Sequence, residues 1–247
     1  MAVSNIDNSA PIAQSCDIYM EEIRNHMEHM ENETLPDLNK INSQPEITWF
    51  MRHYLLDFLV EAHQSFQLSP ETLFLTVNLL DRYCSICIVP NSHYQLLGCV
   101  SLLIAAKYCD KKNIPTTKEL ETIYCSLYNK EMFKKMEWDV LNVLEWRVGN
   151  PTTECYLQIF LTEGFDKAEV EYIARYICEV ALYHKQFVST KPSVMARASV
   201  ALAGFFFDHR DFPGLDYVEN PTLLALLPYL YNISEVLKKK YYSYSFS

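Results

Sequence analysis

Glycine is scarce in this sequence, with 5 residues in 247, whereas Tyr and Phe number 17 and 13. Folds built on tight turns need glycine at positions that other residues rarely adopt. A shortage of glycine together with long periodic apolar segments favours helices joined by short loops. No segment shows a convincing strand pattern, so we predict an all-α fold.

Basic charge is also sparse. Lys and Arg number 21 against 31 Asp and Glu, which gives a formal net charge of −10. Nucleic-acid binding needs a basic surface, and the longest basic cluster is Lys238-Lys239-Lys240. A localisation signal is one interpretation of this triplet. The solvated last turn of a helix is the more common one. We therefore expect no nucleic-acid partner.

The sequence has no apolar run long enough for a membrane span, and its first residues lack a signal-peptide pattern. We therefore expect no membrane association and reduced cysteines. Cys84 and Cys87 form a CxxC motif, but no second pair stands at zinc-ligand spacing. We predict no metal, no cofactor and no catalytic residues.

Helix start signals are frequent, including Ser69-Pro70-Glu71 and a capping box at Thr116 and Glu119. The strongest break in the middle of the chain is Gly149-Asn150-Pro151. Between such signals the apolar periodicity predicts helices at 18–31, 48–66, 70–85, 92–109, 117–125, 130–146, 152–162, 167–186, 191–208 and 221–240, the last broken near Pro228.

Two segments resemble each other, SLLIAAKYCD at 101–110 and SVALAGFFFD at 199–208. Both are apolar nearly all round, as expected of the central helix of a bundle. We predict two similar helical units, at 44–147 and 151–240. An N-terminal segment, 1–43, carries the helix at 18–31, and a short tail covers 241–247.

Four charged residues fall on apolar helix stripes, two of each sign: Arg52, Lys107, Asp81 and Glu137. Buried charges are costly unless they are paired. The simplest interpretation is two ion pairs. The alternative is that each charge stands at a helix end or extends into solvent, which suits Lys107 well and the mid-helix Glu137 poorly.

The helix at 48–66 also has a second apolar face beside its core stripe, formed by Met51, Tyr54, Leu55, Phe58 and Ala62. A surface helix needs a single stripe. Either another part of the chain covers the excess, or it is exposed for a partner. The polar strip of His53, Asp57, Glu61 and Gln64 is interpreted as a solvated face.

These segments resemble the cyclin family. MRHYLLDFLVEA, with QPEIT before it, is similar to the cyclin-box signature, and ETLFLTVNLLDRY, YQLLGCVSLLIAAKY and MEWDVLNVLEW follow in the family's order. Residues 44 to 147 carry most of the resemblance, and KPSVMARASVALA at 191–203 carries a looser one. The segment SPETLFLTVNLLDRY is most similar to the corresponding segment of fungal G1 cyclins.

The resemblance implies an all-α fold of two tandem five-helix cyclin boxes with an additional N-terminal helix. It implies a buried pair of Arg52 with Asp81, and a core position for Leu96. A cyclin-dependent kinase would bind Lys107 and Glu137 beside its PSTAIRE-type helix, with Tyr108 and Trp146 packing on the same partner. Substrates or inhibitors carrying Arg-x-Leu motifs would dock on a groove formed by Met51, Leu55, Phe58, Glu61 and Gln95.

The implied function is a non-catalytic subunit that binds and activates the kinase and helps recruit substrates, at G1/S, in nucleus and cytoplasm. The helix at 18–31 would pack on the box and the kinase, or else bind another partner as a free amphipathic helix. Two alternatives stay open: a cyclin-fold adaptor that binds a kinase without activating it, and a transcription-type cyclin. An all-α enzyme is a third, but we find no catalytic constellation for it.

Overall fold

The computed structural model describes residues 10–123, 127–164, 168–207, 221–231 and 233–242. Every regular element in these residues is helical: α1 (Ala10–Glu33), α2 (Leu38–Asn42), α3 (Trp49–Ser65), α4 (Pro70–Ile86), α5 (Asn91–Cys109), α6 (Thr117–Ile123), α7 (Lys130–Val143), α8 (Thr153–Gly164), α9 (Ala168–Leu182), η1 (Lys185–Phe187), α10 (Pro192–Phe206), α11 (Pro221–Leu226), η2 (Leu227–Leu230) and α12 (Glu235–Tyr242). The predicted helix ends at 124–125, 167 and 208, and positions 243–247 of the predicted tail, lie outside the described residues.

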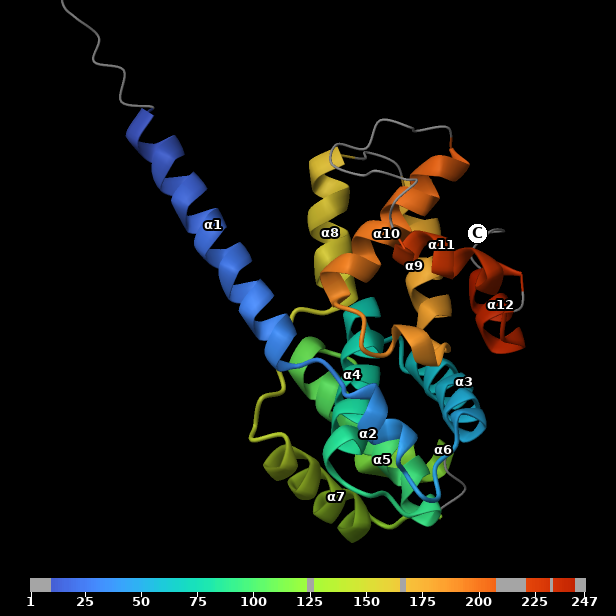
Figure 1. The fold of residues 1–247 in the computed structure, drawn as a ribbon. Helices are drawn as coiled ribbons and strands as arrows, with labels where there is room; N and C mark the ends of the chain where they lie inside the picture. The colour runs from blue at the N-terminus through green and yellow to red at the C-terminus, as the bar shows by residue number, and fades with distance from the viewer. Residues whose placement is uncertain (1–9, 124–126, 165–167, 208–220, 232, 243–247) are drawn as a thin grey trace, which may run out of the picture.

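The helices form two bundles, which lie one above the other in Figure 1. In the lower bundle α5 contacts α3, α4 and α7, and in the upper bundle α10 contacts α8, α9 and α11. Both helices are buried along most of their length, as their apolar circumference predicts. The all-α class, the two five-helix bundles and the additional N-terminal helix are thus confirmed.

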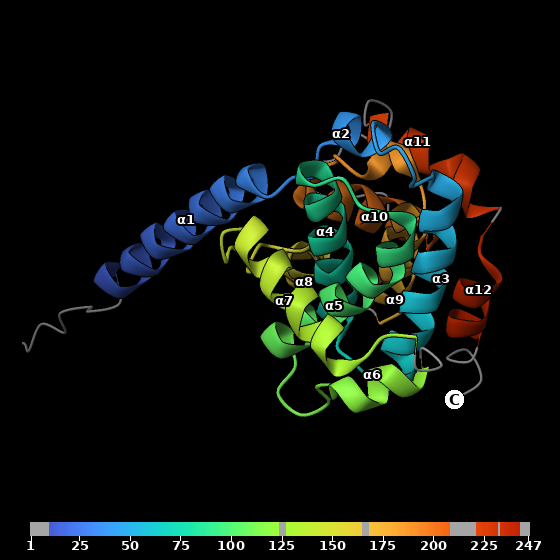
Figure 2. The same ribbon diagram turned by 90° about the horizontal axis from the view of Figure 1, so that it is seen from below.

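Helix α1 is longer than predicted and extends away from the body of the molecule (Figure 2). Its last turn is anchored by Glu31, which is 2% exposed and accepts hydrogen bonds from the backbone N–H and hydroxyl of Ser193 at 3.0 and 2.7 Å. Ser193 lies in the first turn of α10, where N–H groups lack helical partners and the helix dipole favours an anion. Glu31 thus caps α10 from another helix.

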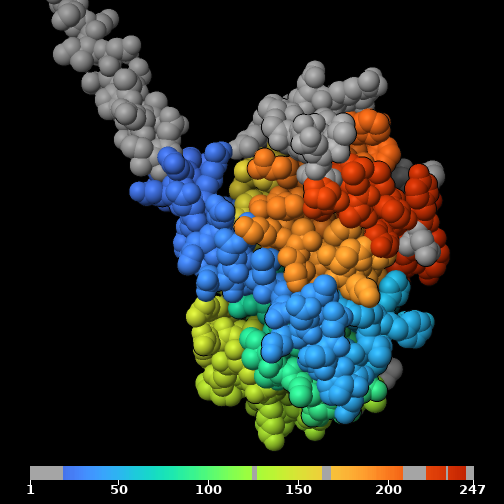
Figure 3. Space-filling model, viewed as in Figure 1, coloured from blue at the N-terminus to red at the C-terminus, as the bar shows by residue number. Residues whose placement is uncertain are grey.

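Helix α2 was not predicted, because five residues give no periodicity to detect. Asp37 caps it by accepting from the N–H groups of Asn39 and Lys40. The segment before it reaches both bundles: the N–H of Asp37 donates to Ser85, and the N–H of Leu38 donates to Ser189. In Figure 3 the blue chain that includes α2 lies against both the orange and the green parts of the surface.

Arg52 and Asp81 form a buried ion pair that joins α3 to α4. The Arg52 Nε and one terminal nitrogen donate to the two Asp81 oxygens at 2.9 and 2.7 Å, and both residues are 3% exposed. Burial acts to lower the pKa of Arg52, but Asp81 outweighs it, so the pKa stays above its ordinary value. The other terminal nitrogen donates to the Leu182 carbonyl at 2.6 Å. The pair therefore holds the end of α9 as well.

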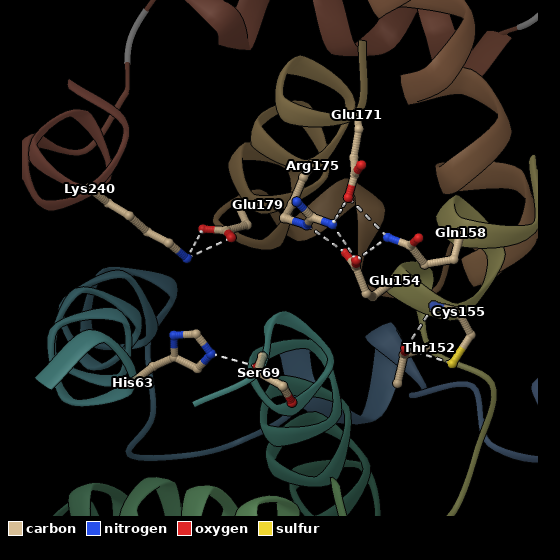
Figure 4. A network of polar contacts seen from close by, with 10 residues as sticks. All are labelled: His63, Ser69, Thr152, Glu154, Cys155, Gln158, Glu171, Arg175, Glu179 and Lys240. Carbon is tan, nitrogen blue, oxygen red and sulfur yellow. Dashed lines mark hydrogen bonds and ion pairs between the residues drawn. The ribbon is translucent and has the colours of Figure 1, made fainter. Parts of the chain in front are cut away.

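A second buried pair fixes α12. Lys240 donates to both Glu179 oxygens at 2.6 and 2.7 Å, and the two residues are 7% and 1% exposed. The interpretation of the lysine triplet as solvated is wrong for Lys240, because the last turn of α12 lies on α9 at an acidic buried position. Figure 4 shows this contact above the ring of His63, with the ion pairs of Arg175 to Glu154 and Glu171 to its right.

The polar strip of α3 is partly covered, so its interpretation as a solvated face is wrong for Asp57. Asp57 accepts a hydrogen bond from Tyr183 at 2.9 Å and another from Ser234 at the start of α12. His53 makes an edge-to-face contact with Tyr183, with ring centroids 5.0 Å apart. His53 and Asp57 thus contact the second bundle, whereas Glu61 of the same strip is exposed.

Removing the charge of Asp81 tests the buried pair. Asp81→Asn leaves Arg52 buried without a counterion, and we expect the free energy of unfolding in urea to fall by about 3–5 kcal/mol. Glu145→Gln is the control, because Glu145 pairs with Arg147 at the exposed surface and should cost less than about 1 kcal/mol. The double variant Arg52→Met/Asp81→Leu should be more stable than Asp81→Asn alone. Equal stability of Asp81→Asn and wild type would contradict this account.

The burial of His63 should make the folded chain less stable in acid. Burial, with help from Lys240, lowers its pKa from 6.5 to about 4, and its Nε2 lies 2.8 Å from the Ser69 carbonyl. The unfolded chain therefore takes up a proton first as the pH falls, and stability is lost between 6.5 and about 4. The free energy of unfolding in urea should fall between pH 7 and about pH 4.5 in wild type. In His63→Gln this fall should be smaller by about 2 kcal/mol. Identical differences would rule out His63 as the source.

Candidate protein-binding surfaces

The first candidate surface is centred on Lys107, in the last turn of α5, and Glu137, in the middle of α7. The ammonium of Lys107 donates to the Glu137 carboxylate. Their side chains are 47% and 21% exposed, so Lys107 stands where α5 leaves the core. Both opposite-charge pairs are thus formed, one inside and one at the surface. The alternative of a helix-end charge in solvent describes Lys107 correctly.

Tyr108 follows Lys107 and is 61% exposed. Its hydroxyl end lies against Gly149, in the segment between α7 and α8. An apolar ring with this much exposure and a fixed position is a common feature of protein-binding surfaces.

Trp146 is exposed, but it does not stand at the end of a helix as predicted. Helix α7 ends at Val143, and Glu145 and Trp146 adopt left-handed backbone angles, with φ of 52° and 59°. The N–H of Trp146 closes the helix by donating to the Leu141 carbonyl at 2.8 Å. Non-glycine residues rarely adopt such angles, so the turn gives Trp146 a defined position.

Trp138, which follows Glu137 in the chain, is an exposed aromatic residue that the sequence argument did not single out. It is 62% exposed and makes an edge-to-face contact with the 57% exposed Trp146, with centroids 5.6 Å apart. A detectable signal existed, because Trp138 stands on the polar side of α7, opposite the buried Phe133 and Val140. The first surface is defined here by the pair Lys107–Glu137 and three aromatic side chains: Tyr108, Trp138 and Trp146.

The second candidate surface is a groove of ≈ 440 Å³ beside α3. Four of the five predicted docking residues line it, namely Met51, Leu55, Phe58 and Gln95. Glu61 does not line it and is exposed one turn beyond Phe58. Phe50, Tyr54 and Tyr128 line it as well, and Phe50 and Tyr54 are 69% and 57% exposed.

The apolar face of α3 is only partly exposed. Leu55 and Ala62 are buried, whereas Met51 and Phe58 are half-buried. Leu55 packs on Gly98 of α5 so closely that a Cβ at position 98 would lie 2.8 Å from a Leu55 methyl. The buried Leu96, two positions after the groove residue Tyr94, belongs to the first core, which is the buried core of the lower bundle. Part of the excess apolar face is therefore covered by α5, and the rest opens into the groove.

The two surfaces consist of apolar and aromatic side chains with a few charged groups. Across the described residues, no three His, Cys, Asp or Glu side chains come together as metal ligands. In the same part of the chain, no helix is both long and apolar enough to cross a membrane. The chemistry that these surfaces offer is apolar contact with a few directed charges, which suits another protein.

Comparison with protein families matches nearly the whole chain. The model of the cyclin N-terminal domain matches residues 22–149, and that of the cyclin C-terminal domain matches residues 151–229. A viral cyclin from Herpesvirus saimiri has a similar fold, with a TM-score of 0.69 over 88% of this chain and 95% of that one at 20% identity.

Curated relatives are more similar in sequence. The chain is 42% identical to the G1/S-specific cyclin CCN1 of Candida albicans over 200 residues, which is 72% of this chain and 29% of that protein. It is 46% identical to the G1/S-specific cyclin CLN3 of the same species over 143 residues, 58% of this chain and 31% of that protein. The chain thus spans about three-tenths of the length of these relatives. With one family model covering just over half of its residues and a second matching most of the remainder, the chain belongs to the cyclin family.

Proposed function

We propose that this chain is the regulatory subunit of a cyclin-dependent protein kinase acting at G1/S. The observation that carries the proposal is the first surface, where a half-exposed Lys–Glu pair has an exposed aromatic residue next to each partner in the chain. Tyr108 follows Lys107, and Trp138, which contacts Trp146, follows Glu137. Family membership and the G1/S-specific names of the similar Candida proteins support it. The chain itself supplies no catalytic group under this proposal.

The first surface suits a partner that offers backbone polar groups beside an apolar helix. The exposed pair contributes little to the stability of the free chain. Once a partner covers it, Lys107 has two further donor hydrogens and Glu137 a second acceptor oxygen to satisfy. The polar groups of Lys107 and Glu137 then fix the orientation of the bound partner, and the aromatic side chains contribute most of the affinity. The kinase's PSTAIRE-type helix is the expected contact.

Activation follows from binding one kinase state better than another. A regulatory helix turned inward places the kinase's own Lys–Glu pair for catalysis. A subunit that contacts only that position shifts the equilibrium towards it. An adaptor would bind the same surface without this preference, so kinase activity in the complex distinguishes the two.

Lys107→Ala and Trp138→Ala test the first surface. Against a cyclin-dependent kinase subunit purified from Candida albicans, each should weaken binding by at least about thirtyfold, as expected for central contacts. Lys111→Ala, also exposed just beyond the same helix, is the matched control and should bind normally. Calorimetry measures binding, thermal unfolding checks the fold, and phosphate transfer to histone H1 measures activation. Unchanged affinity of Lys107→Ala would disprove this assignment, and tight binding without kinase activity would favour the adaptor.

We further propose that the groove beside α3 docks substrates or inhibitors. Its support is the opening lined by Met51, Phe58 and Gln95, with Leu55 at its buried side. An Arg-x-Leu peptide would place its leucine there and its arginine towards Glu61, which is exposed one turn further along α3. Tyr54 and Phe50 also line the groove, so it should favour peptides whose side chains pack on aromatic rings.

Phe58→Ala tests this docking. Titration of a fluorescent Arg-x-Leu peptide should show an affinity loss of about tenfold or more in Phe58→Ala, and a smaller loss in Glu61→Gln. Peptides with the leucine replaced by alanine serve as the control. Equal binding, or none, in wild type and Phe58→Ala would remove the groove as the docking site.

The remaining assignments are also proposals. We propose a division into the first box at 44–147 and the second at 151–240, which the separate first and second cores support. We propose a nuclear and cytoplasmic location, as a kinase subunit at G1/S requires access to substrates in both compartments.

A further inference from the structure

Gly149 lies against the hydroxyl end of the Tyr108 side chain. A Cβ atom at position 149 would lie 2.1 Å from the Tyr108 hydroxyl oxygen and 2.8 Å from Cζ, whereas ordinary contacts begin near 3.4 Å. The backbone at Gly149 is not in the left-handed region, so an alanine would not be strained by its own angles. The observed reason for glycine here is the space that Tyr108 occupies.

The backbone at Gly149 is held in place from its N-terminal side. The N–H of Trp146 donates to the Leu141 carbonyl of α7, and that of Arg147 donates to Leu144 just beyond the helix. The N–H of Val148 donates to the Trp146 carbonyl at 2.9 Å. Arg82, a buried residue of α4, donates to the Arg147 carbonyl at 2.9 Å. Burial, with Arg147 adding to the effect, lowers the pKa of Arg82 to about 10. It remains a cation at neutral pH and a strong donor to this carbonyl.

A side chain at position 149 would therefore displace the ring and not the backbone. Tyr108 is an exposed residue at the end of α5, so its ring has room to move into solvent. Moving it changes the surface next to Lys107, the neighbouring residue.

We propose that Gly149 is a positioning residue for kinase binding, because it provides the packing surface that fixes the Tyr108 ring beside Lys107. Gly149 thereby helps to form the kinase-binding surface without itself touching the kinase. This inference rests on the proposed kinase-binding function.

The test is a double-mutant cycle measured by calorimetry with the purified Candida albicans kinase subunit. Gly149→Ala should weaken binding about tenfold, within the range for coupled neighbours. In a Tyr108→Ala background the same change should alter affinity by less than about twofold. In a Tyr108→Phe background the loss should be intermediate, because phenylalanine removes the atom at 2.1 Å and keeps the one at 2.8 Å. An equal loss in all three backgrounds would overturn the proposal.

A measurement without the kinase separates this inference from the proposed function. With 3-fluorotyrosine at position 108, the fluorine NMR resonance of the free chain should shift on Gly149→Ala and stay in place on Lys111→Ala. A resonance that Gly149→Ala leaves unmoved would overturn the inference. A shifted resonance in a chain that does not bind the kinase would keep the packing role and refute the kinase-binding function on which the proposal rests.

Discussion

The buried ion pair of Arg52 and Asp81 is the interaction on which the arrangement of the two bundles depends. The guanidinium of Arg52 donates hydrogen bonds to Asp81 in α4 and to the Leu182 carbonyl at the end of α9. Cavities of ≈ 80 and ≈ 310 Å³ border the pair, so dense apolar packing does not secure this region alone. The directed bonds of one arginine therefore set how α3, α4 and α9 meet, and through α3 they set the groove.

Much of this structure could be predicted from the sequence because its causes are local or periodic. The apolar circumference of 101–106 and 198–204 required two central helices, and both are buried. Charges on apolar stripes required partners, and Arg52 found one of opposite sign within the same bundle. Helix caps such as Asn129 act on residues two or three positions away, which a sequence displays directly.

What could not be predicted depends on contacts between distant segments. Lys240 looks like a solvated lysine because its partner, Glu179, stands on another helix. Asp57 looks solvated in the sequence because the residues that cover it, Tyr183 and Ser234, belong to the second bundle. Trp138 meets Trp146 only because two left-handed residues reverse the chain after α7. In each case the determining geometry is tertiary, and one sequence without relatives does not contain it.

The contact of Asp57 with Ser234 also bears on the order in which the molecule is made. The two residues are 177 positions apart, and α12 packs on α3 at this place. A ribosome adds residues in sequence, so α3 emerges long before the helix that covers it. Contacts of such separation close late and slowly. The first bundle therefore presents the uncovered side of α3 to chaperones, and to other nascent chains, until α12 has emerged from the ribosome.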